Sequence, residues 1–185
     1  RRVRALLERA RVTVLDETGW KLSTTSAAAA VMRWYDLVAD DLYWRDLLDW
    51  LKSNFTLAGR PDKAPEVAAF ERAIRAGGAL QGAGAIRRAL AAADADDPVL
   101  AHDVAGAREV LDLIVGQMQA AQRAGSTLAA HLRALGAALD ALGMRAGLQA
   151  DPVGRAVLRE IDMLEADVGS VAGRASLADF RALLA

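Results

Sequence analysis

Apolar residues recur every three or four positions along most of this chain, a spacing that places them on one face of an α-helix. The pattern is clearest between residues 98 and 143, where two such stretches are separated by a short polar link. The apolar positions are Leu100, Val104, Ala107, Leu111, Ile114, Met118 and Ala121 in the first stretch and Leu128, Leu132, Leu135, Leu139 and Leu142 in the second. Because the link is so short, the two predicted helices must be antiparallel neighbours.

Residues that favour helix ends lie at the borders of these two stretches. The expected cap and stop are Asp97 and Gly125 for the first helix, and Ser126 or Thr127 and Gly143 for the second. Pro98 and Pro65 each fit the first turn of a helix, where the missing N–H of proline costs little. Asp151 with Pro152 opens another helix in the same way.

The same periodicity predicts further helices on both sides of this pair. Their expected ranges are residues 1–10, 23–39, 40–51, 65–76, 86–93, 152–168 and 176–185. Ser23 is the expected cap of the helix at 23–39, although Thr24, Thr25 and Ser26 offer competing hydroxyls that could shift the start by a few residues. Asp40 with Asp41 is expected to begin the next helix. The residues expected to face inward in the helix at 152–168 are Val153, Val157, Ile161, Leu164 and Val168.

Residues 11–15 alternate and contain β-branched side chains, which predicts a short strand. The expected fold is therefore mainly α, a multi-helix, bundle-like domain with one or two short strands near its N-terminus. We expect one domain over residues 1–185, with a helix–strand–loop junction at 1–25, a helical part at 26–95 and an antiparallel bundle at 96–185. Both ends look cut from a longer protein, so an excised domain is expected.

Composition argues against a disordered chain, a strongly charged nucleic-acid binder and a chain with an apolar membrane span. Hydrophobic residues make up 54% of the 185 residues and charged residues 25%, which is typical of a folding sequence. The net charge of -1 creates no global field that would attract nucleic acid. There is no cysteine, and no apolar run approaches the ~18 residues that a membrane span needs.

The sequence contains no set of residues that matches a known catalytic arrangement. It has no phosphate-binding GxxxxGK[ST] loop, and His102 and His131 stand alone, outside any zinc-ligand spacing. Pro61-Asp62 matches the first part of a metal-dependent nuclease motif. The required second acid and lysine do not follow, so a loop before the next helix is the better interpretation.

Two groups of residues could contact nucleic acid, and each has a plainer explanation. The aromatic group of Trp34, Tyr35, Tyr43, Trp44 and Trp50 could stack on bases, but helical spacing favours a core position. The basic group includes five arginines against one glutamate in residues 1–11, together with Lys21, Lys52, Arg60 and Lys63 in or near loops. Such side chains could bind phosphates or simply cover solvated helix faces.

Residues 1–60 resemble a known family. The order is an Arg-rich helix, the strand Val12–Val14, the loop Asp16-Glu17-Thr18-Gly19-Trp20, and Leu22-Ser23-Thr24-Thr25 before an Ala-rich helix. This order resembles a segment of the AddB-like double-strand-break repair helicase–nucleases, which are also described as RecB-family exonucleases with a PD-(D/E)xK nuclease domain. Residues 47–55 resemble the next element of that family. The remainder is similar, more loosely, to the 2B-type helical insertion of superfamily 1 helicases.

The resemblance implies a non-catalytic helical subdomain of a DNA-repair exonuclease or helicase that contributes to DNA handling or to scaffolding between domains. It implies no cofactor or metal in this fragment, although the parent protein would use ATP and Mg²⁺. The implied partners are DNA, bound through the parent protein, and other domains or a partner subunit, in the cytoplasm. The residues expected to contact DNA phosphates, from the basic cluster and the polar helix start, are Arg1, Arg2, Arg4, Lys21, Ser23 and Thr24. The alternative is a helical protein-interaction module with no nucleic-acid role.

Overall fold

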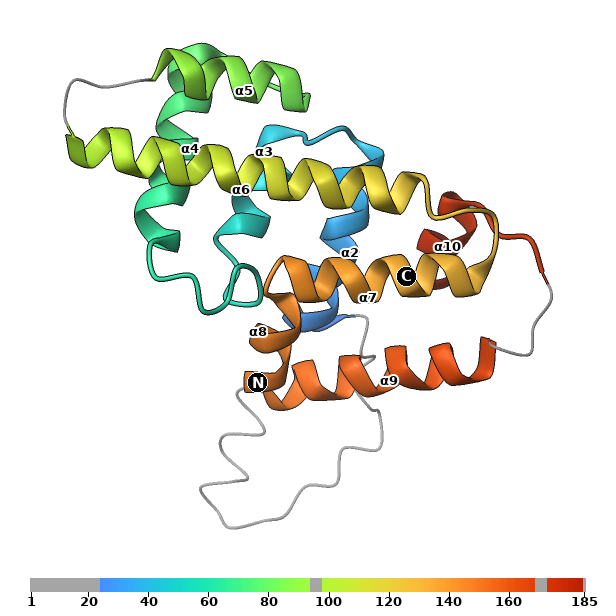
Figure 1. The fold of residues 1–185 in the computed structure, drawn as a ribbon. Coiled ribbons are helices and arrows are strands. Elements are labelled where there is room, and N and C mark those ends of the chain that lie inside the picture. The colour runs from blue at the N-terminus through green and yellow to red at the C-terminus, as the bar shows by residue number, and fades with distance from the viewer. Residues whose placement is uncertain (1–23, 94–97, 169–172, 185) are drawn as a thin grey trace, which may run out of the picture.

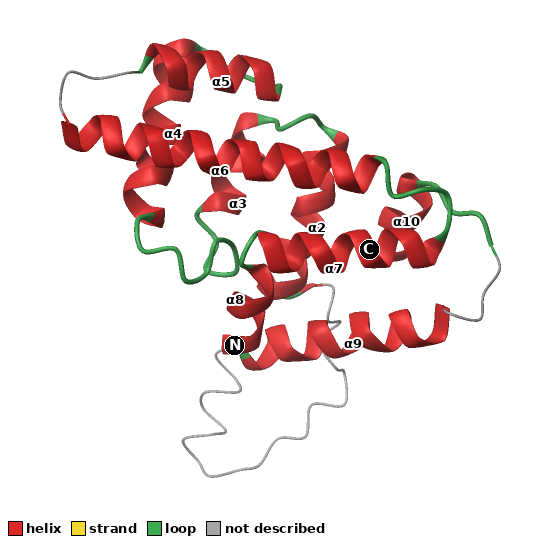
Figure 2. Cartoon of the chain, viewed as in Figure 1, coloured by secondary structure: helices red, strands yellow, loops and turns green. Residues whose placement is uncertain are grey.

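The computed structural model describes residues 24–93, 98–168 and 173–184, and these ranges form nine α-helices. The helices are α2 (Ser26–Ala39), α3 (Trp44–Leu51), α4 (Lys63–Gly77), α5 (Ala83–Ala92), α6 (Pro98–Gln122), α7 (Leu128–Ala141), α8 (Met144–Ala150), α9 (Pro152–Val168) and α10 (Leu177–Leu184). The mainly α prediction is confirmed. Figure 2 shows helices and loops, and the β structure in the described ranges is a single bridge between Thr127 and Arg174. The helix predicted at 1–10 and the strand at 11–15 lie outside the described residues.

The long helix α6 connects two groups of helices (Figure 1). Along its length it contacts α4, α5, α2 and α7. The predicted antiparallel pairing of α6 with α7 is confirmed, and α8 and α9 follow on the other side of α7. In the described ranges, no helix combines the length and apolar character that crossing a membrane requires.

The centre of the core is aromatic, and it joins α2 to α3. Trp34 and Trp50 are fully buried, with ring centroids 5.8 Å apart, and the Trp50 indole N–H donates to the carbonyl of Ala30 at 3.1 Å. Tyr35 is also buried. The core prediction is therefore confirmed for these three aromatic residues, whereas Tyr43 and Trp44 are only partly buried. Rings buried in this way are not available to stack on bases.

One predicted helix start is shifted within the expected range, and another is wrong. Thr25 rather than Ser23 caps α2, because its hydroxyl accepts from the N–H of Ala28 at 3.2 Å. The α3 helix begins at Trp44 and not at the acid pair, since Asp41 and Leu42 have φ angles of 46° and 57°. These left-handed residues form a tight turn that buries the Leu42 side chain completely. Hydrogen bonds to the link between α4 and α5, from Trp44 N to Leu80 O and from Gly82 N to Asp41 O, hold the turn in place.

The predicted borders of the α6–α7 pair are only partly confirmed. Thr127 caps α7 through the N–H of Ala130 at 3.2 Å. Asp97 lies outside the described residues. Gly125, with a φ of 95°, lies in the link and does not directly follow α6, which ends at Gln122. The helix ends two residues earlier than predicted, and the chain reverses before Thr127.

Two features of the region after Gly143 differ from the prediction. The short helix α8 was not predicted. Val153 is 41% exposed, although an inward position was expected. The buried position in the first turn of α9 belongs to Gly154, where an added Cβ would lie 2.3 Å from the carbonyl oxygen of Leu148. The α8–α9 corner is therefore too tight for a side chain at that point, and Val153 turns to solvent.

The last helix is attached to the core by its aromatic residue. Ser176 and Asp179 form the predicted capping box, in which each side chain accepts from the other's backbone N–H at 3.1 and 2.9 Å. Phe180 is fully buried and meets the Tyr35 ring edge-on at 5.4 Å. An ion pair between Arg181 and Asp36 adds a second link from α10 to α2.

Candidate nucleic-acid interface

Most of the residues expected to contact phosphates precede the described part of the chain. Arg1, Arg2, Arg4, Lys21 and Ser23 lie outside it. Thr24 lies within the described residues and is exposed. It directly precedes Thr25, the residue that caps α2. The described part of the candidate site therefore consists of the start of α2 and the surface next to it.

That surface is a groove between α2 and the end of α3, which we call the α2–α3 groove. It has a volume of about 420 Å³. Its lining residues are Ser26, Ala29, Ala30, Arg33, Asp49, Trp50, Lys52 and Ser53. The α2 residues recur every three or four positions, so one face of this helix forms one wall. The groove thus begins at the polar helix start and leads along α2 to two cations.

The two cations of the groove are exposed and weakly held. Arg33 Nη1 lies 4.0 Å from Asp49 Oδ2, and the arginine side chain is 46% exposed. Lys52 Nζ lies 2.7 Å from Glu71 Oε2, with the lysine side chain 50% exposed. The hydrogen bond from Lys52, followed by the charge of Arg75, lowers the pKa of Glu71 below its ordinary value. Exposed pairs of this kind contribute little to stability and can exchange partners readily.

Lys63 was a candidate for phosphate contact, but its ammonium group has an internal role. It donates to the carbonyl oxygens of Ser53 and Thr56 at 2.5 and 2.6 Å, and Thr56 Oγ1 lies at 3.3 Å. Burial lowers the pKa of Lys63. The side chain therefore fastens the turn after α3 to the first residue of α4.

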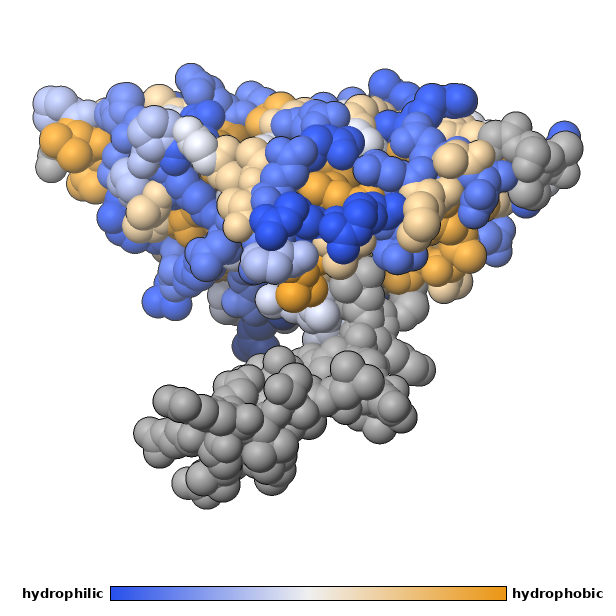
Figure 3. All heavy atoms as spheres, turned by 90° about the horizontal axis from the view of Figure 1, so that it is seen from below, coloured by the Kyte–Doolittle hydropathy of each residue, from blue (hydrophilic) through white to orange (hydrophobic). Residues whose placement is uncertain are grey.

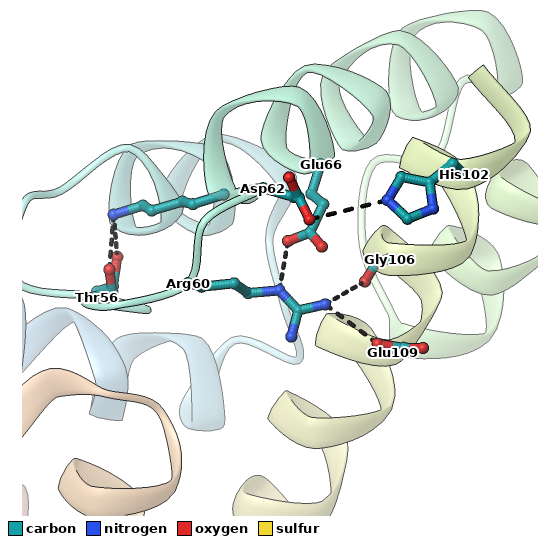
Figure 4. Close-up of polar contacts among 8 residues, drawn as sticks. Thr56, Arg60, Asp62, Glu66, His102, Gly106 and Glu109 are labelled. Carbon is teal, nitrogen blue, oxygen red and sulfur yellow. Dashed lines mark hydrogen bonds and ion pairs between the residues drawn. The ribbon is translucent and has the colours of Figure 1, made fainter. Parts of the chain in front are cut away.

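Arg60 is engaged in a second internal contact, shown in Figure 4. Its Nε donates to Glu66 at 2.6 Å, and its Nη2 donates to Glu109 at 3.2 Å and reaches the Gly106 carbonyl at 3.5 Å. Glu66 is only 4% exposed, and its hydrogen bond is the largest of the effects that raise the pKa of Arg60. Arg60 thus joins the loop before α4 to both α4 and α6.

The remaining polar residues of interest do not form a reactive site. In Figure 4 the imidazole of His102 points towards Asp62, at 3.8 Å, and both side chains are largely exposed. His131 is buried, stacked on Phe180 with centroids 5.5 Å apart, and its Nε2 contacts Ala175 O at 3.0 Å. Among the described residues, no cluster of three or more His, Cys, Asp or Glu side chains could hold a metal.

Comparisons of the chain with protein-family models, with curated proteins and with solved structures found no match. The geometry of the described residues therefore carries the functional argument. It joins hydroxyl groups, the first turn of a helix and two exposed cations in one groove, a combination suited to phosphate oxygens. Sequence reasoning had named Lys52 but missed Arg33. The spacing of Ser26, Ala29 and Arg33 along one helix face was the available signal.

Proposed function

We propose that this chain is a non-catalytic helical subdomain of a DNA-repair exonuclease or helicase, which helps to hold DNA and supports neighbouring domains. One observation carries the proposal. The α2–α3 groove, with Arg33 and Lys52 on its rim, lies within residues 1–60, the part of the sequence that resembles the AddB-like helicase–nucleases. Any ATP or Mg²⁺ would be bound by other parts of the parent protein.

In this proposal a DNA strand runs from the basic N-terminal residues along the start of α2 into the groove. The hydroxyls of Ser26 and Ser53 and the cations of Arg33 and Lys52 face phosphate oxygens. A phosphate would replace Asp49 as the partner of Arg33, which costs little because their separation is already 4.0 Å. Contacts with the backbone alone give binding that depends on salt and not on base sequence.

A fluorescence titration with forked DNA at low salt tests the proposal. Two variants remove the proposed contacts: Arg1/Arg4/Lys21→Ala and Arg33/Lys52→Ala. The control, Arg88/Arg133→Ala, removes two exposed cations from α5 and α7. We expect both test variants to bind more weakly. The slope of log affinity against log salt should fall by about 0.9 for each phosphate that a variant can no longer neutralise.

The control variant should bind like the wild type. Equal affinity of the wild type and Arg33/Lys52→Ala would refute the role of the groove. Equal affinity of the wild type and Arg1/Arg4/Lys21→Ala would refute the role of the N-terminal residues. If all four proteins fail to bind DNA, the proposed DNA contact is wrong.

The second candidate function is a helical protein-interaction module. It is favoured by a separate apolar groove, which we call the α9 groove, formed where α2, α9 and α10 meet. Its lining residues are Ala28, Val31, Met32, Val157, Glu160, Ile161, Leu164, Leu183 and Leu184. Absence of DNA binding, together with loss of partner binding when Leu183 is replaced by Glu, would favour this candidate.

A further inference from the structure

The α9 groove has the properties of a docking site for a helix. Its volume of about 170 Å³ is well below the ~300 Å³ at which small-molecule pockets begin, so it suits a few apolar side chains of a macromolecule. Leu183 on its rim is 52% exposed, as is Met163 on the neighbouring surface of α9. Exposed apolar side chains beside an apolar groove are typical of an interaction surface. Figure 3, which views the molecule from below, shows hydrophobic patches among hydrophilic residues on that side.

The second half of α9, beside this groove, is acidic. From residue 160 to residue 168, α9 contains acidic residues and no lysine or arginine. The acids are Glu160, Asp162, Glu165 and Asp167, and all four residues are exposed. Glu160 lines the groove, and Glu165 lies one turn after Ile161 on the same side of the helix. A ligand for this surface should therefore be apolar on one face and basic along its edges.

The chain itself contains a segment with that pattern, at residues 1–11. Its sequence predicts an amphipathic helix with Val3, Leu6, Leu7 and Ala10 on one face. At about 100° per residue, Arg4 and Arg11 lie on one edge of this face and Arg2 and Arg9 on the other. Such a helix would be about 16 Å long, close to the roughly 18 Å of α9 between Val157 and Val168.

The chain between residues 1–11 and α2 is long enough for this segment to reach the α9 groove. The described chain starts at Thr24, and Ala28, one turn into α2, lines the α9 groove. Residues 12–23 can span about 40 Å when extended, which exceeds the length of α9. A tethered segment also binds at a high effective concentration, so modest contacts suffice.

From these observations we propose that residues 1–11 dock in the α9 groove. The apolar face of the segment lies against Ile161 and Leu164, and its edge arginines lie beside Glu160 and Glu165. Arg1 lies on the opposite face of the segment and stays directed to solvent, where it remains available to phosphate. Arg2 and Arg4 can contact a phosphate only after they leave the acids of α9. The proposal goes beyond the proposed function and does not depend on it.

Disulfide trapping tests this docking directly, because the chain has no cysteine of its own. The test variant of the full chain is Leu7→Cys/Leu164→Cys. The control is Leu7→Cys/Leu80→Cys. Leu80 is also a leucine at the surface, but it lies in the link between α4 and α5. Under mild oxidation we expect the test pair to form an intramolecular disulfide at least about tenfold faster than the control pair.

A third variant adds Glu160→Lys/Glu165→Lys to the test pair and should slow trapping about tenfold. Adding Asp112→Lys, on α6, should leave the rate unchanged. Circular dichroism checks that every variant keeps its helices. Equal trapping of the test and control pairs, or no trapping in folded protein, would overturn the proposal. Disulfide-linked dimers as the main product would also overturn it and would assign the groove to a second copy.

Discussion

Two regions of this molecule contain similar cations in different settings. In the α2–α3 groove, Arg33 and Lys52 are about half exposed, and each meets one acidic side chain. Where the chain enters α4, Arg60 in the preceding loop and Lys63 at the start of the helix are more enclosed, and each contacts at least two acceptors. The second pair is committed to the fold, whereas the first pair can change partners. Exposure and number of acceptors therefore separate structural cations from candidate ligand-binding ones.

The largest effect should follow loss of Glu66, the buried acid in the first turn of α4. Replacement of Glu66 by Ala leaves Arg60 without its closest partner, and we expect a loss of about 2–3 kcal/mol in the free energy of unfolding. The matched control is Glu109→Ala, which removes the other acid that Arg60 contacts. Because that side chain is 74% exposed, its loss should cost less than about 1 kcal/mol.

Urea unfolding followed by circular dichroism measures both variants. If both substitutions cost the same amount, the distinction between a buried and an exposed partner of Arg60 is wrong. A Glu66→Ala variant as stable as the wild type would show that this pair does not support the fold.

Lys63 should have the next largest effect. Replacement by Met keeps the length of the side chain but removes its hydrogen bonds to the carbonyls of Ser53 and Thr56, at a cost of about 1–2 kcal/mol. The control is Lys52→Met in the α2–α3 groove, where an exposed lysine is lost and the cost should stay below about 1 kcal/mol. Equal costs at the two lysines would contradict their assignment to different roles.

The lowered pKa of Lys63 predicts that the stability of the protein depends on pH. Burial lowers the pKa of Lys63 in the folded protein, so between that pKa and the ordinary value of 10.5 the unfolded chain binds more protons. The contribution of Lys63 to stability should therefore rise with pH in the window just below 10.5. Unfolding of the wild type and the Lys63→Met variant across this window measures the effect. A stability difference that stays constant with pH would refute it.

The helix faces could be predicted from the sequence because each is set by local periodicity. Trp34 and Leu37, or Val104 and Leu111, occupy the core as their spacing requires. The start of α3 could not be predicted, because the left-handed turn at Asp41 and Leu42 depends on hydrogen bonds to a link about forty residues away.

The helix α8 was missed for a related reason. One of its contacts is made by a glycine, since an added Cβ at Gly147 would lie 2.8 Å from Phe55 Cα. Only Met144 and Leu148 are left to mark the buried face of this seven-residue helix, which is too short a pattern to predict it. Only one wall of the α2–α3 groove could be predicted from the sequence. The spacing of Ser26 and Arg33 indicates that wall, whereas Lys52 reaches the opposite wall only through the fold.

A smaller effect is expected from two glycines of α6 that differ only in their surroundings. At Gly106 an added Cβ would lie 2.3 Å from Glu66 Oε1, whereas at Gly116 nothing lies within 4 Å. Gly116→Ala should stabilise the protein by up to about 1 kcal/mol through helix propensity. Gly106→Ala should instead destabilise it by about 1 kcal/mol, because the crowding opposes that gain.

The double variant Glu66→Ala/Gly106→Ala shows whether the crowding comes from Glu66. In the absence of that carboxylate, the alanine at 106 should no longer destabilise the protein. A Gly106→Ala change that remains equally costly in this background would mean that another contact of α6 limits the space.

The smallest expected effect is a change in the pKa of Glu71, the partner of Lys52. It shows whether the cations of the α2–α3 groove are held as loosely as their exposure indicates. The hydrogen bond from Lys52, followed by the charge of Arg75, keeps the pKa of Glu71 below 4.5. The stability from these contacts is present above that value and is lost as the pH falls through the lowered pKa. Lys52→Ala should move the Glu71 pKa upwards, and so should high salt in the wild type, because exposed pairs are screened. An NMR titration of the Glu71 side chain measures both shifts. A pKa that does not respond to salt would mean that Lys52 is held as firmly as Lys63, and a phosphate could then not recruit it without a cost to the fold.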